Sequence, residues 1–385
     1  MHVLVAGAGP VGLTAALLAA AGGLTVTVLE AEPESAPRPG SRAIFLHRVS
    51  LDTLGACDPS LARGLIASGL TWRGKTTLWR GREVFHKSYP AMPVSQAPFA
   101  SLPQQHIECQ LRSACERAGV RILWNTGVTA VAAGASHVEV TAGSGVVHRA
   151  GFLIGADGAR SAVRAAIGAC LTGDRADNAF VVMDLNDDSH HPLPPTRVFH
   201  YQHPGADGRN VLLVPFRGGW RVDLQCRPGD DPSGLASDPR RWLAPLLPEG
   251  HSAEVTWASH YRFQQLVASQ FVDSSGRVLL AGEAAHLFAP FGARGLNSGI
   301  ADAAAAVHAV RSDAVDDYGA TRRTAALRNQ AAAGRALRHL LARDPFTRLR
   351  QATAAGVARR WPAAGTWLDS APYGPRDAGI PGSLY

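Results

Sequence analysis

The stretch HVLVAGAGPVGLTAALLAAAGGLTVTVLE, residues 2–30, decides the fold class of this chain. Residues 2–6 form a short apolar run, residues 10–21 are rich in alanine, and residues 24–29 alternate with β-branched side chains. The pattern predicts a strand, a helix and a second strand that ends at Glu30. This order of elements is typical of an α/β fold with a parallel sheet.

Three glycines, Gly7, Gly9 and Gly12, lie between the first strand and the helix in the GxGxxG spacing. In this motif the first glycine allows a tight turn, the second lets the backbone approach a pyrophosphate, and the third allows close helix packing. The helix starts at Pro10 and Val11, and the unpaired N–H groups of its first turn, which proline itself lacks, point toward phosphates. The stretch therefore predicts a dinucleotide site, whereas a glycine-rich turn without a ligand is the alternative.

Glu30 supports the first interpretation, because it follows Gly12 by 18 residues at the end of the second strand. A carboxylate there accepts hydrogen bonds from the ribose hydroxyls of a dinucleotide and disfavours a 2′-phosphate. The rest of the chain holds no second GxGxxG fingerprint of this kind. One dinucleotide is therefore expected to occupy the site.

The middle of the chain predicts two further groups of elements. The first is a helix, a β-meander and a strand of the nucleotide-binding domain, and the second is an antiparallel sheet. A helical pattern at 104–118 precedes three short alternating segments, 120–124, 128–131 and 137–141, which resemble a β-meander, and then a strand at 152–154. Four strand-like stretches follow without a crossover helix, at 180–185, 197–202, 210–216 and 219–225. A buried strand at 278–281 and helices at about 298–310 and 321–342 complete the pattern.

Composition narrows the class of protein. The 385 residues are 46% hydrophobic and 18% charged, as in a globular protein. The net charge of +7 comes from arginines interleaved with acids, which does not favour a nucleic-acid binder. Five cysteines without a CxxC pair, and no signal-peptide or membrane-span pattern, predict a cytoplasmic protein with reduced thiols. The cysteines are Cys57, Cys109, Cys115, Cys170 and Cys226.

Three separated motifs together resemble the class A FAD-dependent aromatic monooxygenases, the para-hydroxybenzoate hydroxylase family. They are GAGPVG at Gly7, DGARSAVR at Asp157 and GEAAHLFAPFGARGLNSGIADA at Gly282, with further similarity at SRAIFLHR and LPQQHIE. The resemblance implies an FAD-binding domain from residues 1–70, 100–174 and 266–320, and a substrate-binding domain from 71–99 and 175–265. Residues 321–385 are expected to form a C-terminal helical segment and tail.

By this resemblance, noncovalent FAD is expected to contact residues from every motif. Glu283 replaces the family's usual aspartate and keeps a carboxylate for the ribityl chain, and Gly292 and Gly295 allow close approach of the loop. Pro290 and Arg294 are expected to serve catalysis beside the flavin ring, with Arg294 favouring the anionic reduced flavin. The full set of predicted FAD contacts is Gly7, Gly9, Pro10, Val11, Gly12, Glu30, Ala31, Arg42, Gln104, Arg112, Val128, Asp157, Gly158, Glu283, Pro290, Gly292, Gly295, Leu296 and Asn297.

The resemblance implies that NADPH or NADH reduces FAD, that dioxygen adds to give a C4a-hydroperoxide, and that this species oxygenates a small aromatic or electron-rich substrate. Tyr201 is the candidate catalytic residue of the substrate domain, with Arg221 and His47 as further candidates for the base. A metal site at Asp187 and its neighbours is disfavoured, because prolines indicate a solvated turn. A non-oxygenating FAD oxidoreductase and a flavin-binding redox sensor remain alternatives. The protein is expected to be a monomer or homodimer.

Overall fold

A five-stranded parallel sheet forms one end of the molecule in the computed structural model, which describes residues 1–36, 43–90, 92–93, 96–188, 192–247, 251 and 253–374. The strand order is β17-β11-β1-β2-β7, and every neighbouring pair is parallel. The strands are β1 (His2–Ala6), β2 (Thr25–Leu29), β7 (Arg121–Leu123), β11 (Phe152–Gly155) and β17 (Val278–Leu280). All three motifs therefore follow strands of a single sheet.

Helices cover this sheet, and most residues of α1 (Pro10–Ala21) are buried. It starts at a proline, which suits the first helical position because that residue has no N–H to leave unpaired. Its apolar side chains are buried against the sheet and the neighbouring helices. The helices that contact α1 are α2 (Arg48–Cys57), α4 (Gln104–Arg117) and α8 (Arg294–Ser312), and the same end of the molecule also holds α3 (Pro59–Ser68) and α5 (Ala162–Ala166).

Two small sheets flank the parallel sheet. The β-meander consists of β8 (Val128–Ala133), β9 (Val138–Ala142) and β10 (Val147–Ala150). The segment at 120–124 was expected in this meander, but its strand β7 pairs in parallel with β2 instead. In this register Arg121 lies beside Thr27 and Leu123 beside Leu29, so β7 forms an edge strand of the parallel sheet. A two-stranded antiparallel sheet joins β3 (Ile44–His47) to β6 (Phe99–Leu102).

An eight-stranded sheet forms the other end of the molecule, in the order β18-β16-β12-β15-β14-β13-β4-β5. Its pairs are antiparallel except β4 with β13, which are parallel. The four predicted strands correspond to β12 to β15, and the sheet also contains the long strand β16. The strands are β4 (Gly74–Trp79), β5 (Arg82–Ser88), β12 (Leu171–Asn186), β13 (Thr196–His203), β14 (Arg209–Phe216), β15 (Gly219–Gln225), β16 (Glu254–Ala268) and β18 (His286–Leu287).

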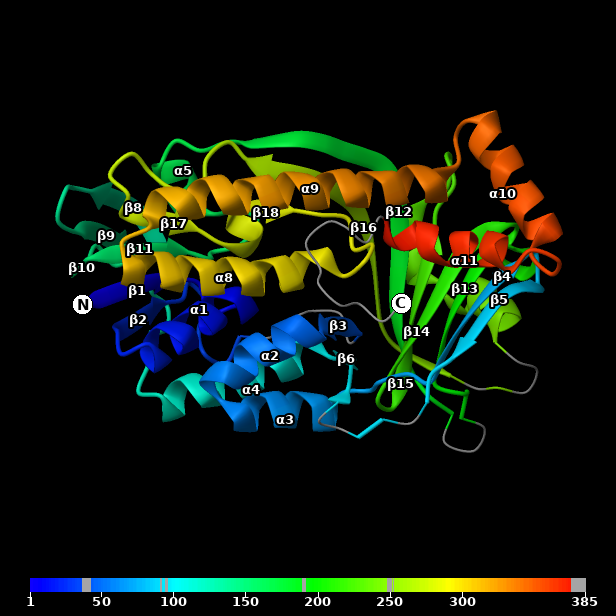
Figure 1. Ribbon diagram of the computed structural model, residues 1–385, viewed down its shortest axis with the longest axis horizontal. Helices are drawn as coiled ribbons and strands as arrows, with labels where there is room; N and C mark the ends of the chain where they lie inside the picture. Colours follow the sequence, from blue (N-terminus) through cyan, green and yellow to red (C-terminus); the bar gives the residue numbers. More distant parts are fainter. Residues whose placement is uncertain are drawn as a thin grey trace.

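The C-terminal helices connect the two ends. Figure 1 shows α9 (Val315–Leu341) running above both the parallel sheet and the eight-stranded sheet, with α10 (Pro345–Val357) and α11 (Pro362–Ser370) beyond it. The chain then enters η5 (Ala371–Tyr373), which returns against α9. Short helices elsewhere are α6 (Pro232–Ser237), α7 (Arg240–Leu243), η2 (Pro204–Ala206), η3 (Ala244–Leu246) and η4 (Gly282–Ala284).

The predicted fold class is confirmed: a parallel sheet with a β-meander, a largely antiparallel second sheet and C-terminal helices. The expected domain limits differ slightly from the strand limits, because β12 begins at Leu171 and β16 continues to Ala268. Among the residues described, every helix is too short or too polar to span a lipid bilayer.

Candidate active site

The turn after β1 has the geometry that its glycines predict. Gly7 has φ +97°, and a Cβ on Gly12 would lie 2.0 Å from the Gly7 carbonyl oxygen, so a side chain cannot fit there. A Cβ on Gly9 would meet nothing within 4 Å, which leaves open space in front of the turn. No side chain caps the first turn of α1. The turn is therefore an open, N–H-lined cradle suited to a phosphate.

Glu30 is buried at the end of β2 and faces this turn. Its carboxylate accepts from the Ala8 N–H at 2.5 Å and from the Glu32 N–H at 3.0 Å. Ala31 is close to the start of β8, since a Cβ on Gly127 would lie 3.0 Å from the Ala31 side chain. The structure thus brings Glu30, Ala31 and Val128 to the same edge, at the carboxyl end of the parallel strands.

Asp157 follows β11 and uses its carboxylate within the protein. It accepts from the Ser161 hydroxyl at 2.5 Å and from the Val163 N–H at 3.1 Å, at the start of α5. Ser161 in turn accepts from the Arg164 N–H at 2.8 Å. Gly158 has φ +78° and open space around its missing side chain. Asp157 therefore has a helix-capping role in addition to any contact with a cofactor.

Glu283 follows β17 of the parallel sheet and lines a pocket. The side chain is exposed to the pocket, yet the surrounding protein shields it from bulk water and raises its pKa, while nearby His286 acts in the opposite direction. His286 Nε2 donates to Asp302 at 2.7 Å, and Arg322 donates to the other oxygen of Asp302 at 2.7 Å. This buried network fixes the strand end that carries Glu283.

The loop from Pro290 to α8 turns sharply. Gly292 has φ +77° and Ala293 φ +52°, whereas Gly295 is already helical and does not have a positive φ. A Cβ on Gly295 would meet nothing within 4 Å, so the space beside this glycine is open. Asn297 anchors the loop: its amide oxygen accepts from the His47 N–H at 2.9 Å and from the Ser50 hydroxyl at 2.7 Å.

Arg294 is buried at the first turn of α8 and is held by two other segments. Its Nη1 donates to Asn329 Oδ1 at 2.8 Å, and its Nη2 donates to the Tyr373 carbonyl oxygen at 3.0 Å. Asn329 belongs to α9 and Tyr373 to η5. The guanidinium therefore places a positive charge in the pocket wall and joins the loop to the C-terminal segment.

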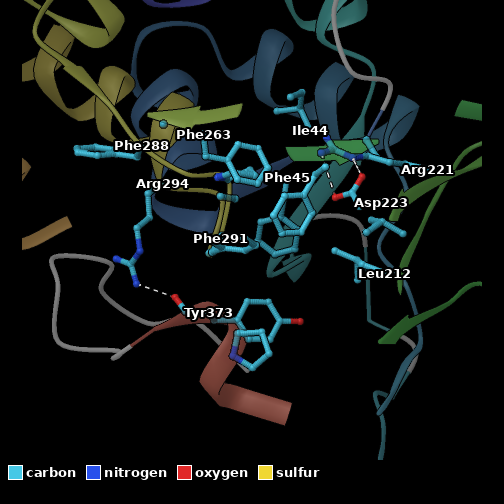
Figure 2. A pocket seen from close by; sticks show the side chains of 18 of the residues that line it. Ile44, Phe45, Leu212, Arg221, Asp223, Phe263, Phe288, Phe291, Arg294 and Tyr373 are labelled. Atoms are coloured by element: carbon cyan, nitrogen blue, oxygen red, sulfur yellow. Dashed lines mark hydrogen bonds and ion pairs between the residues drawn. The ribbon is translucent and has the colours of Figure 1, made fainter. Parts of the chain in front are cut away.

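A cavity of about 330 Å³ lies between this loop and the eight-stranded sheet. Figure 2 shows Phe45, Phe263 and Phe291 gathered in one part of it, with Arg221 and Asp223 on one side and Arg294 on another. The ring centroids of Phe263 and Phe291 are 5.6 Å apart, and both contact Phe180. Arg221 and Asp223 form an ion pair at 2.6 Å. The cavity therefore combines aromatic walls with a few fixed polar groups, as ligand sites do.

Of the remaining predicted FAD contacts that the structure describes, Gln104 and Arg112, only Gln104 is among the residues that line this cavity. Gln104 lines it and donates to Glu108 at 2.9 Å. Arg112, on the same helix, lies 3.6 Å from Glu34 and 5.5 Å from the centre of the Trp124 ring. Arg42 is outside the described residues, as are His190 and His191, two of the neighbours of Asp187 in the disfavoured metal site.

The three candidates for a catalytic base occupy different positions. Tyr201 is buried beside α9 and α11, with its hydroxyl 2.8 Å from His339 Nε2 and donating to the Leu368 carbonyl at 2.7 Å, and it does not line the cavity. His47 lies behind the loop and donates to the Gly292 carbonyl at 3.2 Å, and burial lowers its pKa to about 4. Arg221 lines the cavity but is paired with Asp223. The structure gives Tyr201 a packing role.

Sequence reasoning did not find the aromatic wall. Phe180, Phe263 and Phe291 come from β12, β16 and the loop, and in sequence each resembles an ordinary core residue. Only their meeting in space makes them a site. One signal in the sequence pointed to Phe180 and Phe263: both lie between residues 175 and 265, where the substrate-binding domain is expected.

Comparison with known proteins assigns the family. The FAD binding domain family matches residues 1–326. Para-nitrophenol 4-monooxygenase of Pseudomonas sp. (strain WBC-3) is 31% identical over 319 residues, which cover 78% of this chain and 75% of that protein. A crystal structure of p-nitrophenol 4-monooxygenase from Pseudomonas putida DLL-E4 matches with a TM-score of 0.76 and 26% identity, over 97% of this chain and 98% of the other. The chain belongs to the family of FAD-dependent aromatic monooxygenases.

A longer relative is also similar. The 6-methylpretetramide 4-monooxygenase of Streptomyces rimosus is 35% identical over 322 residues, which cover 78% of this chain. The matched part is 54% of that protein, so the chain corresponds to about half of its length. The named relatives are oxidoreductases of the monooxygenase type.

Proposed function

We propose that the protein is an FAD-dependent monooxygenase that uses NADPH or NADH and dioxygen to hydroxylate, or otherwise oxygenate, a small aromatic or electron-rich substrate. The observation that carries the proposal is the cavity of about 330 Å³ between the residues of the FAD motifs and an aromatic wall. Glu283 and the loop from Pro290 to Leu296 bound it on one side, and β12 to β15 bound it on the other. Two relatives named as monooxygenases, of 6-methylpretetramide and of para-nitrophenol, support the same reaction class.

The residues of the parallel sheet fit FAD. The open cradle at Gly9 suits its pyrophosphate, Glu30 suits its adenosine ribose, and Glu283 suits the ribityl chain. When bound, FAD would supply the redox chemistry by which two electrons from NAD(P)H and one dioxygen yield an oxygenated product and water. The chain itself binds, orients and shields the reactants.

Three features of the cavity serve those tasks. The rings of Phe180, Phe263 and Phe291 offer faces and edges on which a planar substrate packs, and their apolar surface excludes water. The buried guanidinium of Arg294 stabilises negative charge that develops near the loop. Glu283 holds a proton to a higher pH than an exposed glutamate does, because its pKa is raised.

The test is a coupled assay on the FAD-loaded protein. Denaturation should release noncovalent FAD, and 4-nitrophenol or a related phenol should stimulate oxidation of NADPH or NADH. With ¹⁸O₂, one labelled oxygen atom should enter the product. NAD(P)H oxidation without label in the product would favour a non-oxygenating oxidoreductase. Absence of any stimulated oxidation over a phenol panel would favour the redox sensor, and release of FMN would contradict the assignment of Glu30 and the glycine turn.

A further inference from the structure

The chain beyond residue 326, where the match to the FAD binding domain family ends, contributes to the cavity. Pro372 and Tyr373, in η5, line it together with the loop and the eight-stranded sheet. Figure 2 shows Tyr373 at the end of the pocket below Arg294, and the dashed line marks the bond between them. The segment after α9 therefore forms a wall of the pocket.

Three contacts from separate elements hold η5 in place. The Tyr373 carbonyl accepts from Arg294 at 3.0 Å. Gly374 has φ +75°, and a Cβ on it would lie 2.5 Å from the Ala332 carbonyl oxygen, so the turn is pressed against α9. The Tyr373 ring lies 4.6 Å from the centre of the Arg197 guanidinium, which comes from β13. Contacts from the loop, from α9 and from β13 therefore converge on this residue and define the position of its ring.

A buried cluster of charges attaches the preceding helix to the same sheet. Asp369, at the end of α11, pairs with Lys75 on β4 and accepts from the Thr77 hydroxyl at 3.0 Å. Arg197 lies 3.8 Å from the same carboxylate. All of these side chains are buried, and a charge left unpaired in such surroundings is costly. The cluster therefore fixes the register of α11, and with it the place of Tyr373 four residues later.

The side chain of Tyr373 suits a wall rather than an acid-base role. Burial raises its pKa, so the hydroxyl stays neutral at ordinary pH. The ring is large, and its position at the end of the cavity limits how far a planar ligand extends away from the loop.

We propose that Tyr373 is a specificity-determining residue of the pocket, which limits the size of the aromatic ligand, and that the C-terminal segment after residue 326 thereby selects the substrate. This inference rests on the proposed function for its choice of ligand. Removing the ring should extend the cavity at that end and admit a ligand with more fused rings.

The experiment measures binding to the FAD-loaded protein without turnover. Wild type, Tyr373→Ala, Tyr373→Leu and Tyr373→Phe are titrated with 4-nitrophenol and with the three-ring 9-phenanthrol, and the flavin absorbance change gives each Kd. Wild type should prefer 4-nitrophenol. The ratio of the two Kd values should shift at least tenfold toward 9-phenanthrol in Tyr373→Ala, less in Tyr373→Leu, and less than twofold in Tyr373→Phe. Leu349→Ala, at an exposed position of α10, is the control and should leave the ratio unchanged.

Three results would overturn the inference: an equal change of both Kd values in Tyr373→Ala, no change in either, or a wild type that binds neither phenol. Tyr373→Leu keeps the test decisive if Tyr373→Ala does not fold. NAD(P)H oxidation in the same samples separates this inference from the proposed function. A shifted ratio without phenol-stimulated oxidation refutes the function alone, whereas labelled product with an unshifted ratio refutes the role of Tyr373 alone.

Discussion

The nucleotide end of the molecule, built on the five-stranded parallel sheet, and the pocket end, built on the eight-stranded sheet, are stabilised by different kinds of contact. At the nucleotide end, the decisive contact joins Gly12 to Gly7, which are five residues apart, and it depends on the absence of a side chain. At the pocket end, the decisive contact joins Lys75 to Asp369, which are 294 residues apart, and it depends on two buried charges. Local backbone constraints are visible in a sequence, whereas long-range side-chain pairs become visible only once the chain has folded.

The strongest test of the nucleotide end is Gly12→Ala. Its Cβ would lie 2.0 Å from the Gly7 carbonyl oxygen, so α1 cannot keep its place against the turn. We expect loss of bound FAD and a large fall in thermal stability, measured by released FAD per chain and by the unfolding temperature. Gly9→Ala is the matched control, because a Cβ there meets nothing within 4 Å. It should fold normally and weaken only FAD binding. A Gly12→Ala protein with full FAD content would show that the nucleotide end does not depend on the absence of a side chain at this position.

The equivalent test of the pocket end is Asp369→Ala. It leaves the buried Lys75 ammonium without its partner, which should cost about 3 to 5 kcal/mol in the free energy of unfolding. Burial already lowers the pKa of Lys75, and the variant should lower it further. Urea unfolding of the apoprotein measures the loss.

Asp52→Ala is the control for that experiment, because the Arg48–Asp52 pair is 40% and 56% exposed at its two side chains. Such exposed pairs contribute about 1 kcal/mol or less. Equal losses in the two variants would mean that the pocket end does not depend on its buried charges.

The sequence predicted the opening strand–helix–strand unit of the nucleotide end, although it placed β7 in the meander. The strand, glycine turn, helix and terminal Glu30 are consecutive in the chain, so each depends on its neighbours and the pattern carries the whole unit. At the pocket end, the strands β12 to β15 were found from their alternation, but β16 was not predicted as a strand. Its alternation over Val255, Trp257, Tyr261 and Phe263 is interrupted at Gln264-Gln265 and gives way to the buried run 266–268. The parallel pairing of β4 with β13 was also not predicted, because pairing direction depends on the path of distant segments.

Tyr201 illustrates why site residues of the second sheet could not be predicted. It lies on the same face of β13 as Arg197 and Phe199, which line the cavity, since all three share the two-residue period of a strand. Periodicity identifies the face but not the position along it. Tyr201 is farther along, under α11 and His339, where the C-terminal helices cover it.

Histidine at the junction of the two ends gives a test by pH. Burial lowers the pKa of His47 to about 4 from its usual 6.5, so the unfolded chain binds the extra proton more readily than the folded protein. The contribution of neutral His47 to the free energy of unfolding is present in full above pH 6.5. It is lost as the pH falls toward 4, and the loss is about 3 kcal/mol at pH 4. We expect His47→Gln to have a flatter dependence of unfolding free energy on pH in this window. Between pH 7 and 8 the two proteins should differ by a constant amount, and parallel curves down to pH 4 would contradict the prediction.

Arg294 connects the ends, and its charge can be separated from its bonds. Arg294→Ala should slow anaerobic reduction of the flavin by NAD(P)H by about 1 to 3 kcal/mol in barrier, as expected for loss of a charge-assisted interaction. Asn329→Ala is the control, because it removes the 2.8 Å bond to Nη1 but keeps the charge. Stopped-flow reduction should therefore be slow in the first variant and nearly normal in the second. Equal slowing in both would assign the effect to the position of the loop instead of its charge.

The smallest effect tests whether Asp157 belongs to the cofactor site or only to the fold. Ser161→Ala removes the hydroxyl that accepts from the Arg164 N–H and donates to Asp157, so the start of α5 should lose about 1 kcal/mol of stability. Because this hydroxyl is buried, the variant should bind FAD as tightly as the wild type. Asp157→Asn disturbs the same cap, since one of its carboxylate oxygens, which accept from Ser161 and the Val163 N–H, becomes an amide nitrogen.

Comparing Ser161→Ala with Asp157→Asn separates the effect of the Asp157 carboxylate on FAD binding from its effect on stability. If both lose similar stability and keep the Kd of FAD, measured by fluorescence titration of the apoprotein, the motif at Asp157 acts by capping a helix, a local backbone task like that of Gly12. If Asp157→Asn alone weakens FAD binding, its carboxylate also acts on the nucleotide. Asp157 would then be a further charged group, beside the buried Glu30, on which the nucleotide end depends, and the two ends would differ chiefly in how far apart in the chain their paired residues lie.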